Sequence, residues 1–277
     1  MQDEKISAPP LNPQKTGQTG RARELFPEVE GWPDETISEY LPLLREAYEH
    51  ITGKCSGYEL YPIGSSIPRL HTYKHPTETP GDFVEKECPA SRGRVRQALI
   101  RELPKRFLSL RFEEVDAKNR VAGFVENFPE LKAQGRGLLI AGPVGAGKSQ
   151  LVVSLLVELV SRYLVRVKFL TFSELLELFK QSINDESKAV EANSLFREDV
   201  IAIDDIGTGR VSDYDMERIN TFIDKIYRDM SPCLIVTTNL NKKDLAAHIG
   251  ERIISRLVEM SETIILTGPD RRLNKGE

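Results

Sequence analysis

The sequence has little cysteine, with three in 277 residues. So small and odd a number excludes a disulfide-stapled scaffold and favours a reducing compartment, the cytoplasm. No run approaches the roughly 18 apolar residues that a membrane-spanning helix needs, so the sequence predicts no membrane partner. The first residues carry acids and lack an apolar segment, which argues against a secretory signal.

A strong charge of either sign is also missing. The formal net charge of −4 excludes a nucleic-acid binder that is basic all over, although local basic patches remain compatible with it. One such patch follows residue 91, where basic residues alternate with apolar ones. It is either a charged helix and linker or a contact with nucleic-acid phosphates or with the base and ribose of a nucleotide. Its basic residues are Arg92, Arg94, Arg96, Arg101, Lys105, Arg106 and Arg111.

Apolar patterning divides the chain into three parts. Residues 1–33 have no apolar periodicity and are rich in polar residues, proline and glycine, which predicts a mobile tail. Residues 34–100 are expected to form a smaller helical and irregular N-terminal region. Residues 101–277 are expected to form a larger α/β domain.

The smaller region begins with apolar residues at helical spacing: Ile37, Tyr40, Leu41, Leu44, Tyr48 and Ile51. Pro42 either kinks this helix or opens its second half as a first-turn residue. The apolar stripe either packs within its own small domain or docks on a partner protein, and the sequence leaves both open.

Two cysteines and two histidines in the same region raise the question of zinc. Cys55, His71, His75 and Cys88 could close a tetrahedral site, but the usual pair of closely spaced cysteines is absent. Zinc is therefore expected to be absent, with these residues lying on the surface or in the core.

The strongest motif of the chain follows a short apolar run that ends at Ala141. It reads G-x-x-x-x-G-K-S and leads directly into a helical pattern, the strand–loop–helix context of a phosphate-binding loop. Glycines let the backbone approach the phosphates, and the lysine and serine serve the outer phosphates and Mg²⁺. The sequence therefore predicts binding of a nucleoside triphosphate, ATP. The expected binding residues are Gly142, Pro143, Val144, Gly145, Ala146, Gly147, Lys148, Ser149 and Gln150.

Strands and helices alternate from residue 135 onward. Five apolar stretches are expected to be strands, at 138–141, 166–170, 200–203, 234–236 and 263–266. Helices between them imply crossover connections, so the fold class is α/β with a mainly parallel central sheet covered by helices on both faces. Thr171 and Ser212 are each followed three residues later by an acid, which predicts capping boxes at the starts of two helices.

Polar residues at the ends of these strands are the candidates for chemistry. Asp204 ends a buried strand, where it would hold Mg²⁺ together with Ser149. Asp205 would polarise the attacking water. Asn239 would donate to the γ-phosphate or the water. Arg256, with Arg252 one helical turn before it, and Arg272 near the chain end present planar forks suited to phosphate oxygens.

These motifs together resemble the AAA+ superfamily, and within it the DnaC/DnaI/IstB group of bacterial helicase loaders and transposition helper ATPases. The resemblance extends from Leu103 to Arg272 and includes VIAIDDIG at Val200–Gly207 and GERIISRL at Gly250–Leu257. It implies a five-stranded AAA+ domain. Lys148 and Ser149 become the Walker A pair, and Asp204 and Asp205 the Walker B acids.

The same resemblance implies further roles and partners. Asn239 becomes the first sensor, Arg256 a finger that acts on a neighbouring subunit, and Arg272 a second sensor. It also implies oligomers formed through the ATPase domain, an N-terminal region that grips a hexameric replicative helicase, and contact with single-stranded DNA. Many relatives carry Glu at the position of Asp205, and the shorter side chain favours slow hydrolysis that acts as a switch. Candidate DNA contacts are Lys168, Lys180, Lys188 and Arg210.

Four functions remain open at this point, and one of them is an ATP-binding scaffold that hardly hydrolyses ATP. An ATP-dependent helicase loader fits the roughly 100 residues ahead of the ATPase core. The alternatives are a transposition helper ATPase that binds duplex DNA and, from another class, a metabolic P-loop kinase.

Overall fold

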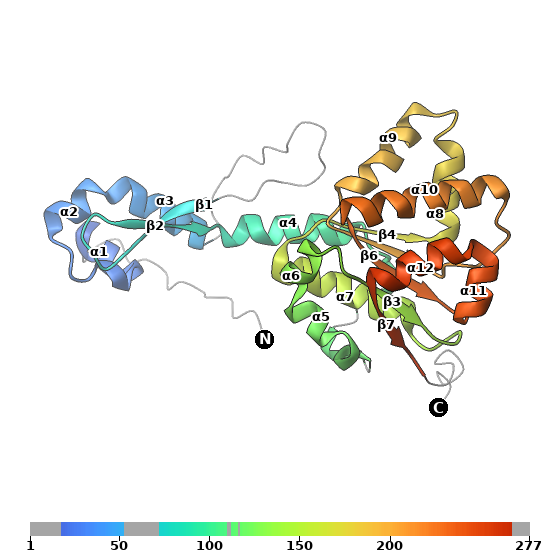
Figure 1. The fold of residues 1–277 in the computed structure, drawn as a ribbon. Coiled ribbons are helices and arrows are strands. Elements are labelled where there is room, and N and C mark those ends of the chain that lie inside the picture. The colour runs from blue at the N-terminus through green and yellow to red at the C-terminus, as the bar shows by residue number, and fades with distance from the viewer. Residues whose placement is uncertain (1–17, 53–71, 110–111, 116, 268–277) are drawn as a thin grey trace. The chain divides into compact units, whose positions relative to one another are not determined.

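The structure is a computed structural model that describes residues 18–52, 72–109, 112–115 and 117–267. The chain divides into two compact units, Met1–Ala98 and Leu99–Glu277. The boundary lies two residues before the expected one. The elements of both units are drawn in Figure 1.

The N-terminal unit is a small helical layer beside a two-stranded hairpin. Its strands β1 (Thr72–Pro76) and β2 (Phe83–Glu87) are antiparallel. Side chains from several short segments share one buried apolar cluster, and the Trp32 indole nitrogen donates to the Thr77 carbonyl at 3.0 Å. The helical elements are α1 (Gln18–Leu25), η1 (Pro27–Val29), α2 (Asp34–Glu39), α3 (Leu41–Ile51) and α4 (Pro89–Arg101), whose last residues, from Leu99 on, belong to the second unit.

The expected mobile tail is wrong for residues 18–33. This segment forms α1 and η1, and Phe26, Val29 and Trp32 are fully buried in the apolar cluster. The sequence did not indicate this because Phe26, Val29 and Trp32 lie in a loop, a 3-10 turn and a bend, and not on one face of a regular α-helix. Residues 1–17 lie outside the described part of the chain.

The structure shows the position of Pro42 in the next helix and what covers the apolar stripe. Pro42 opens α3 as a first-turn residue, and Tyr40 separates it from α2. Ile37 and Leu44 are buried in the cluster of their own unit, whereas Ile51 stays 40% exposed. The apolar stripe is therefore mostly covered by its own domain, and docking of its exposed part on a partner stays a prediction.

The second unit contains a five-stranded parallel sheet with the order β4-β5-β6-β3-β7. Continuous apolar runs form its strands because both faces are buried. The fold class predicted from the sequence is confirmed. The strands are β3 (Gly137–Ala141), β4 (Val167–Thr171), β5 (Val200–Asp204), β6 (Cys233–Thr238) and β7 (Ser261–Ile265).

Helices cover both faces of this sheet. On one face, Leu139, Ile203 and Val236 join a cluster with side chains of α8, α10, α11 and α12. By alternation, Ile140 and Ile235 point to the opposite face, where α7 contacts the sheet. The main helices of the unit are α5 (Ala122–Glu126), α6 (Phe128–Ala133), α7 (Lys148–Tyr163), α8 (Phe172–Gln181), α9 (Glu186–Ser194), α10 (Asp213–Asp229), α11 (Lys242–Ile249) and α12 (Glu251–Glu259).

The helix starts follow the chemistry read from the sequence. Thr171 with Glu174 and Ser212 with Asp215 each form a complete capping box, as predicted. The polar segment after α8 contains α9, whose first turn is capped by the Asp185 carboxylate. Within the described ranges, none of the helices is long and apolar enough to cross a membrane.

Candidate nucleotide site

The glycine-rich loop connects β3 to α7. Gly147 has φ of 89°, a conformation that non-glycine residues rarely adopt, and it caps the start of α7. Gly142 is needed for another reason, since a Cβ there would lie 2.6 Å from the Leu266 carbonyl oxygen beyond β7. Pro143 and Val144 at the tip are exposed. The loop thus presents its backbone at the carboxyl edge of the sheet.

Lys148 and Ser149 begin α7 directly below this loop. Lys148 is only 5% exposed, and its ammonium group donates to the carbonyls of Gly142 at 2.9 Å and Pro143 at 3.0 Å. The positive charge therefore lies inside the loop, beside the N-terminal end of α7. Backbone N–H groups and the helix dipole add positive potential at the same place. The arrangement suits a polyphosphate anion.

Asp204 ends β5 and reaches the same edge. The Ser149 hydroxyl donates to Asp204 Oδ2 at 2.6 Å, and the carboxylate is 6% exposed. A serine hydroxyl beside one carboxylate is an oxygen donor set of the kind that Mg²⁺ uses together with substrate phosphates. These two residues therefore fit the expected metal.

A residue that sequence reasoning missed connects the two acids. The Thr237 hydroxyl donates to Asp204 Oδ1 at 2.6 Å and accepts from the Asp205 backbone N–H at 2.8 Å. Thr237 is completely buried in β6, the neighbour of β5. The two threonines before Asn239 were the signal available in the sequence. Only the pairing of β5 with β6 gives Thr237 its partners.

Asp205 adopts a left-handed backbone conformation with φ of 56°. Such a conformation is uncommon outside glycine, although aspartate tolerates it better than most residues. Its amide is held by Thr237, and the half-buried side chain follows the end of β5. Asp205 therefore lies just past the regular strand that ends at Asp204.

Asn239 follows β6 at the same edge of the sheet. Its Oδ1 is buried and has no hydrogen-bond partner among the residues that the structure describes. β6 lies between β5 and β3, so Asn239 comes after the strand that separates the acids from the phosphate loop. The placement agrees with a polar group that faces the site, and the role of its amide stays a prediction.

The two arginines of α12 contact α10 within this chain. Arg256 forms an ion pair with Asp224 and lies over the Tyr227 ring, with 5.4 Å from the guanidinium carbon to the ring centre. Arg252 Nη2 lies 2.9 Å from the same carboxylate. Arg272 lies outside the described residues.

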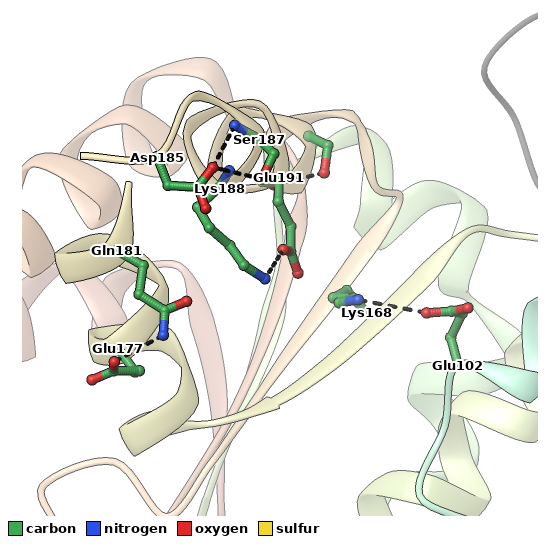
Figure 2. Close-up of polar contacts among 9 residues, drawn as sticks. Glu102, Lys168, Glu177, Gln181, Asp185, Ser187, Lys188 and Glu191 are labelled. Carbon is green, nitrogen blue, oxygen red and sulfur yellow. Dashed lines mark hydrogen bonds and ion pairs between the residues drawn. The ribbon is translucent and has the colours of Figure 1, made fainter. Parts of the chain in front are cut away.

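Three of the four candidate DNA contacts take part in ion pairs. Figure 2 shows Lys168 directed at Glu102 and Lys188 at Glu191, with Nζ–O distances of 3.5 and 2.8 Å. Lys180 pairs with Asp215 at 3.3 Å. Each of these lysines thus has an acidic partner within its own unit. Their binding to DNA stays a prediction. Arg210, the fourth candidate, is exposed.

The proposed zinc residues are only partly visible. Cys55 and His71 lie outside the described residues. His75 Nε2 lies 3.0 Å from Glu28 Oε1, and Cys88 is buried in the apolar cluster of the N-terminal unit. No three histidine, cysteine or acidic side chains within the described ranges gather as a metal site.

Comparisons with known proteins agree with this geometry. Residues 124–276 match the family described as IstB-like ATP binding protein. The chain is 25% identical over 146 residues to the replicative helicase loader DnaC of Escherichia coli K12, a match that covers 52% of this chain and 58% of the relative. The chain thus spans little more than half the length of the curated relatives that it matches.

Solved structures extend the same likeness. A crystal structure of the DnaC helicase loader superposes with a TM-score of 0.54 at 26% identity, covering 59% of this chain and 100% of that chain. The DnaI structure has a TM-score of 0.52 at 22% identity, covering 61% and 94%, and supports the fold alone. Because the family model covers more than half of the sequence, this chain belongs to the IstB-like ATP-binding proteins, AAA+ ATPases distantly related to DnaC.

Proposed function

We propose that this protein is an ATP-dependent helicase loader. It would dock on a hexameric replicative DNA helicase and help to place it on single-stranded DNA, with slow ATP hydrolysis acting as a switch. The likeness to the helicase loader DnaC in sequence and structure supports the loading role. The observation that carries the ATP-dependent part is the contact between Ser149 and Asp204 beside the loop that holds Lys148.

The residues around this contact would divide the work of phosphate binding. Lys148 would donate to the outer phosphate oxygens in place of the Gly142 and Pro143 carbonyls that it contacts here. Ser149 and Asp204 would hold Mg²⁺, which would offset charge on the transferring phosphoryl group when bound. The remaining loop backbone would donate N–H groups to the inner phosphates.

Hydrolysis needs a water molecule held in line with the γ-phosphate. Asp205 would accept a hydrogen bond from that water, and the Asn239 amide would donate to the γ-phosphate or orient the water. Asp205 is one CH₂ shorter than the glutamate that many AAA+ proteins have here. A carboxylate with less reach favours slow turnover, which suits a switch more than a motor.

Self-association through the ATPase domain would complete the site. Arg256 would act on the nucleotide of a neighbouring copy, because within its own chain it contacts α10. Arg272, near the chain end, would serve as a second sensor. The N-terminal unit, with its own buried core, would provide the contact to the helicase.

A pull-down and a loading assay with the full chain test this proposal. We expect the wild-type protein to capture its replicative helicase and to raise the amount of helicase on single-stranded DNA when ATP is present. Lys148→Ala should still capture the helicase but fail to load it, because the nucleotide is needed for the switch. Failure of the wild-type chain to bind any replicative helicase would sink the loader assignment.

The second candidate is a transposition helper ATPase that binds duplex DNA and delivers a transposase. The description of the matching family, IstB-like ATP binding protein, favours it. The same capture experiment could recover a transposase and no helicase, together with ATP-dependent binding to duplex DNA. That result would favour the transposition helper over the helicase loader. Membership among the AAA+ ATPases sets the metabolic kinase aside.

A further inference from the structure

One carboxylate on α10 binds both arginines of α12. Asp224 Oδ2 lies 2.9 Å from Arg252 Nη2, and its other oxygen pairs with Arg256. The arginines occupy successive turns of α12, so they reach the same side of the helix. The Asp224 carboxylate thus links α10 to α12 through two ion pairs.

The contacts restrain Arg256 much more than Arg252. The Arg256 side chain is 19% exposed, paired on one side and covered by the Tyr227 ring, whose hydroxyl donates to Glu259 at 2.8 Å. Arg252 is 67% exposed. A free arginine has to lose side-chain entropy before it can hold one geometry. Arg256 has already lost much of that freedom in the single chain.

The charge balance keeps this arginine able to bind an anion. Two guanidinium groups share a single carboxylate, so the group of Arg252, Arg256 and Asp224 carries one net positive charge. A guanidinium has five N–H donors in a fixed fork, more than one carboxylate uses. The pairing therefore orients Arg256 without cancelling its attraction for a phosphate.

We propose that Asp224 is a positioning residue for ATP hydrolysis: it holds Arg256 in the orientation in which a second copy of this chain receives it at its own bound nucleotide. The inference rests on the proposed function, in which Arg256 acts between subunits. It adds a residue on α10 that contacts no nucleotide itself and controls turnover through Arg256.

Steady-state ATP hydrolysis by Asp224→Asn tests the proposal. Amide for carboxylate keeps the shape and removes the charge, so the Arg256 guanidinium should become mobile. A misplacement of about 1 Å in a catalytic group costs on the order of a hundredfold, and we expect kcat to fall by about tenfold to a hundredfold. KM for ATP should stay unchanged because the loop of the nucleotide's own subunit binds it.

Asp229→Asn is the matched control. It removes a carboxylate from the same helix, where Asp229 Oδ2 lies 2.8 Å from the exposed Lys225 Nζ, away from both arginines of α12 in the sequence. It should leave kcat, KM and the melting temperature as in the wild type. A rise in kcat for Asp224→Asn would mean that the carboxylate holds Arg256 back, and an unchanged kcat would mean that it does nothing. Either result overturns the proposal.

Mixed oligomers separate this role from a loss of folding. The Asp205→Asn chain keeps Arg256 and Asp224 but lacks the acid for the water, whereas the Asp224→Asn chain keeps an intact nucleotide site. An equal mixture should hydrolyse ATP faster than the two proteins do separately, because each Asp224→Asn site can receive a correctly held Arg256 from its neighbour. If Asp224→Asn only impaired folding, the mixture would hydrolyse ATP no faster than the two separate proteins.

Using Arg256→Ala in place of Asp224→Asn in the mixture separates the role of Asp224 from the role of Arg256. If Arg256→Ala is rescued by Asp205→Asn and Asp224→Asn is not, the arginine acts between subunits and the role of Asp224 is wrong. If Arg256→Ala hydrolyses ATP like the wild type, the inter-subunit arginine of the proposed function is itself wrong.

Discussion

The Thr237 hydroxyl donates a 2.6 Å hydrogen bond to Asp204 Oδ1 inside the second unit. The same oxygen accepts the backbone N–H of Asp205, so one buried side chain fixes both acids at the end of β5. Ser149 binds the remaining oxygen of Asp204. The carboxylate is therefore held from β6 on one side and from α7 on the other, which fixes its orientation toward the phosphate loop.

Replacing Thr237 by valine should slow ATP hydrolysis. Valine keeps the shape but leaves the Asp205 N–H without its acceptor, at a cost of about 1–3 kcal/mol in folding stability. We expect kcat to drop by about tenfold or more, since misplaced catalytic groups lose on that scale. Thr237→Ser, which keeps the hydroxyl, should retain most of the activity in the same steady-state assay. Equal rates for the valine and serine variants would contradict the role.

Ser149→Ala should weaken the response to magnesium. The hydroxyl is expected to be a metal ligand, and losing a group at a metal site costs about 10–100-fold in affinity. A Mg²⁺ titration of ATP hydrolysis should therefore shift to higher concentration by about tenfold. Ser154→Ala is the control, because that hydroxyl lies on the same helix and donates to the Leu151 carbonyl at 2.9 Å. An identical magnesium dependence for both variants would speak against Ser149 as a ligand.

Trp32→Ala should unfold the N-terminal unit and spare the nucleotide site. Trp32 is the only tryptophan in the chain, is 1% exposed and lies in the apolar cluster of that unit. Removing so large a buried side chain costs about 3–5 kcal/mol. Limited proteolysis should then cut within residues 18–98, while binding of a fluorescent ATP analogue persists. Trp32→Phe, which loses the bond to Thr77, should be milder. Loss of nucleotide binding in Trp32→Ala would show that the units depend on each other.

Asp215 should make the second unit less stable in acid. Burial alone would raise the pKa of its carboxyl, but hydrogen bonds from Ser212 and the ion pair with Lys180 outweigh it, so the pKa is lowered. The ionised form therefore stabilises the fold above about pH 4, the unfolded value, and this contribution is lost as the pH falls through the folded value.

Asp215→Asn should accordingly lose about 1–3 kcal/mol of unfolding free energy at pH 7, since it breaks a buried, charge-assisted capping box. The difference from the wild type should shrink below about pH 4, where the wild-type carboxyl also becomes protonated. Urea denaturation between pH 3 and 7 measures it. The control is Asp213→Asn, an exposed acid in the same first turn of α10. A gap that does not change with pH would rule out the charge as its cause.

The sequence alone determined the architecture of the second unit. Five apolar runs separated by amphipathic segments can bury both faces only as a parallel sheet covered by helices. The motif from Gly142 to Ser149 predicts a bound nucleoside triphosphate. The two capping boxes were also readable, because a helix start is decided by residues three apart. Such local patterns need no knowledge of distant contacts.

Only the tertiary structure decided which distant residues meet. Thr237 lies more than thirty residues beyond Asp204, and they touch because β5 and β6 are neighbours in the sheet. Asp224 meets Arg256 because α10 packs against α12. Residues 18–33 enter the core of the N-terminal unit through contacts that no helical or strand periodicity in the sequence predicts. Hydrogen bonds and ion pairs depend on distance in space, which a linear pattern does not encode.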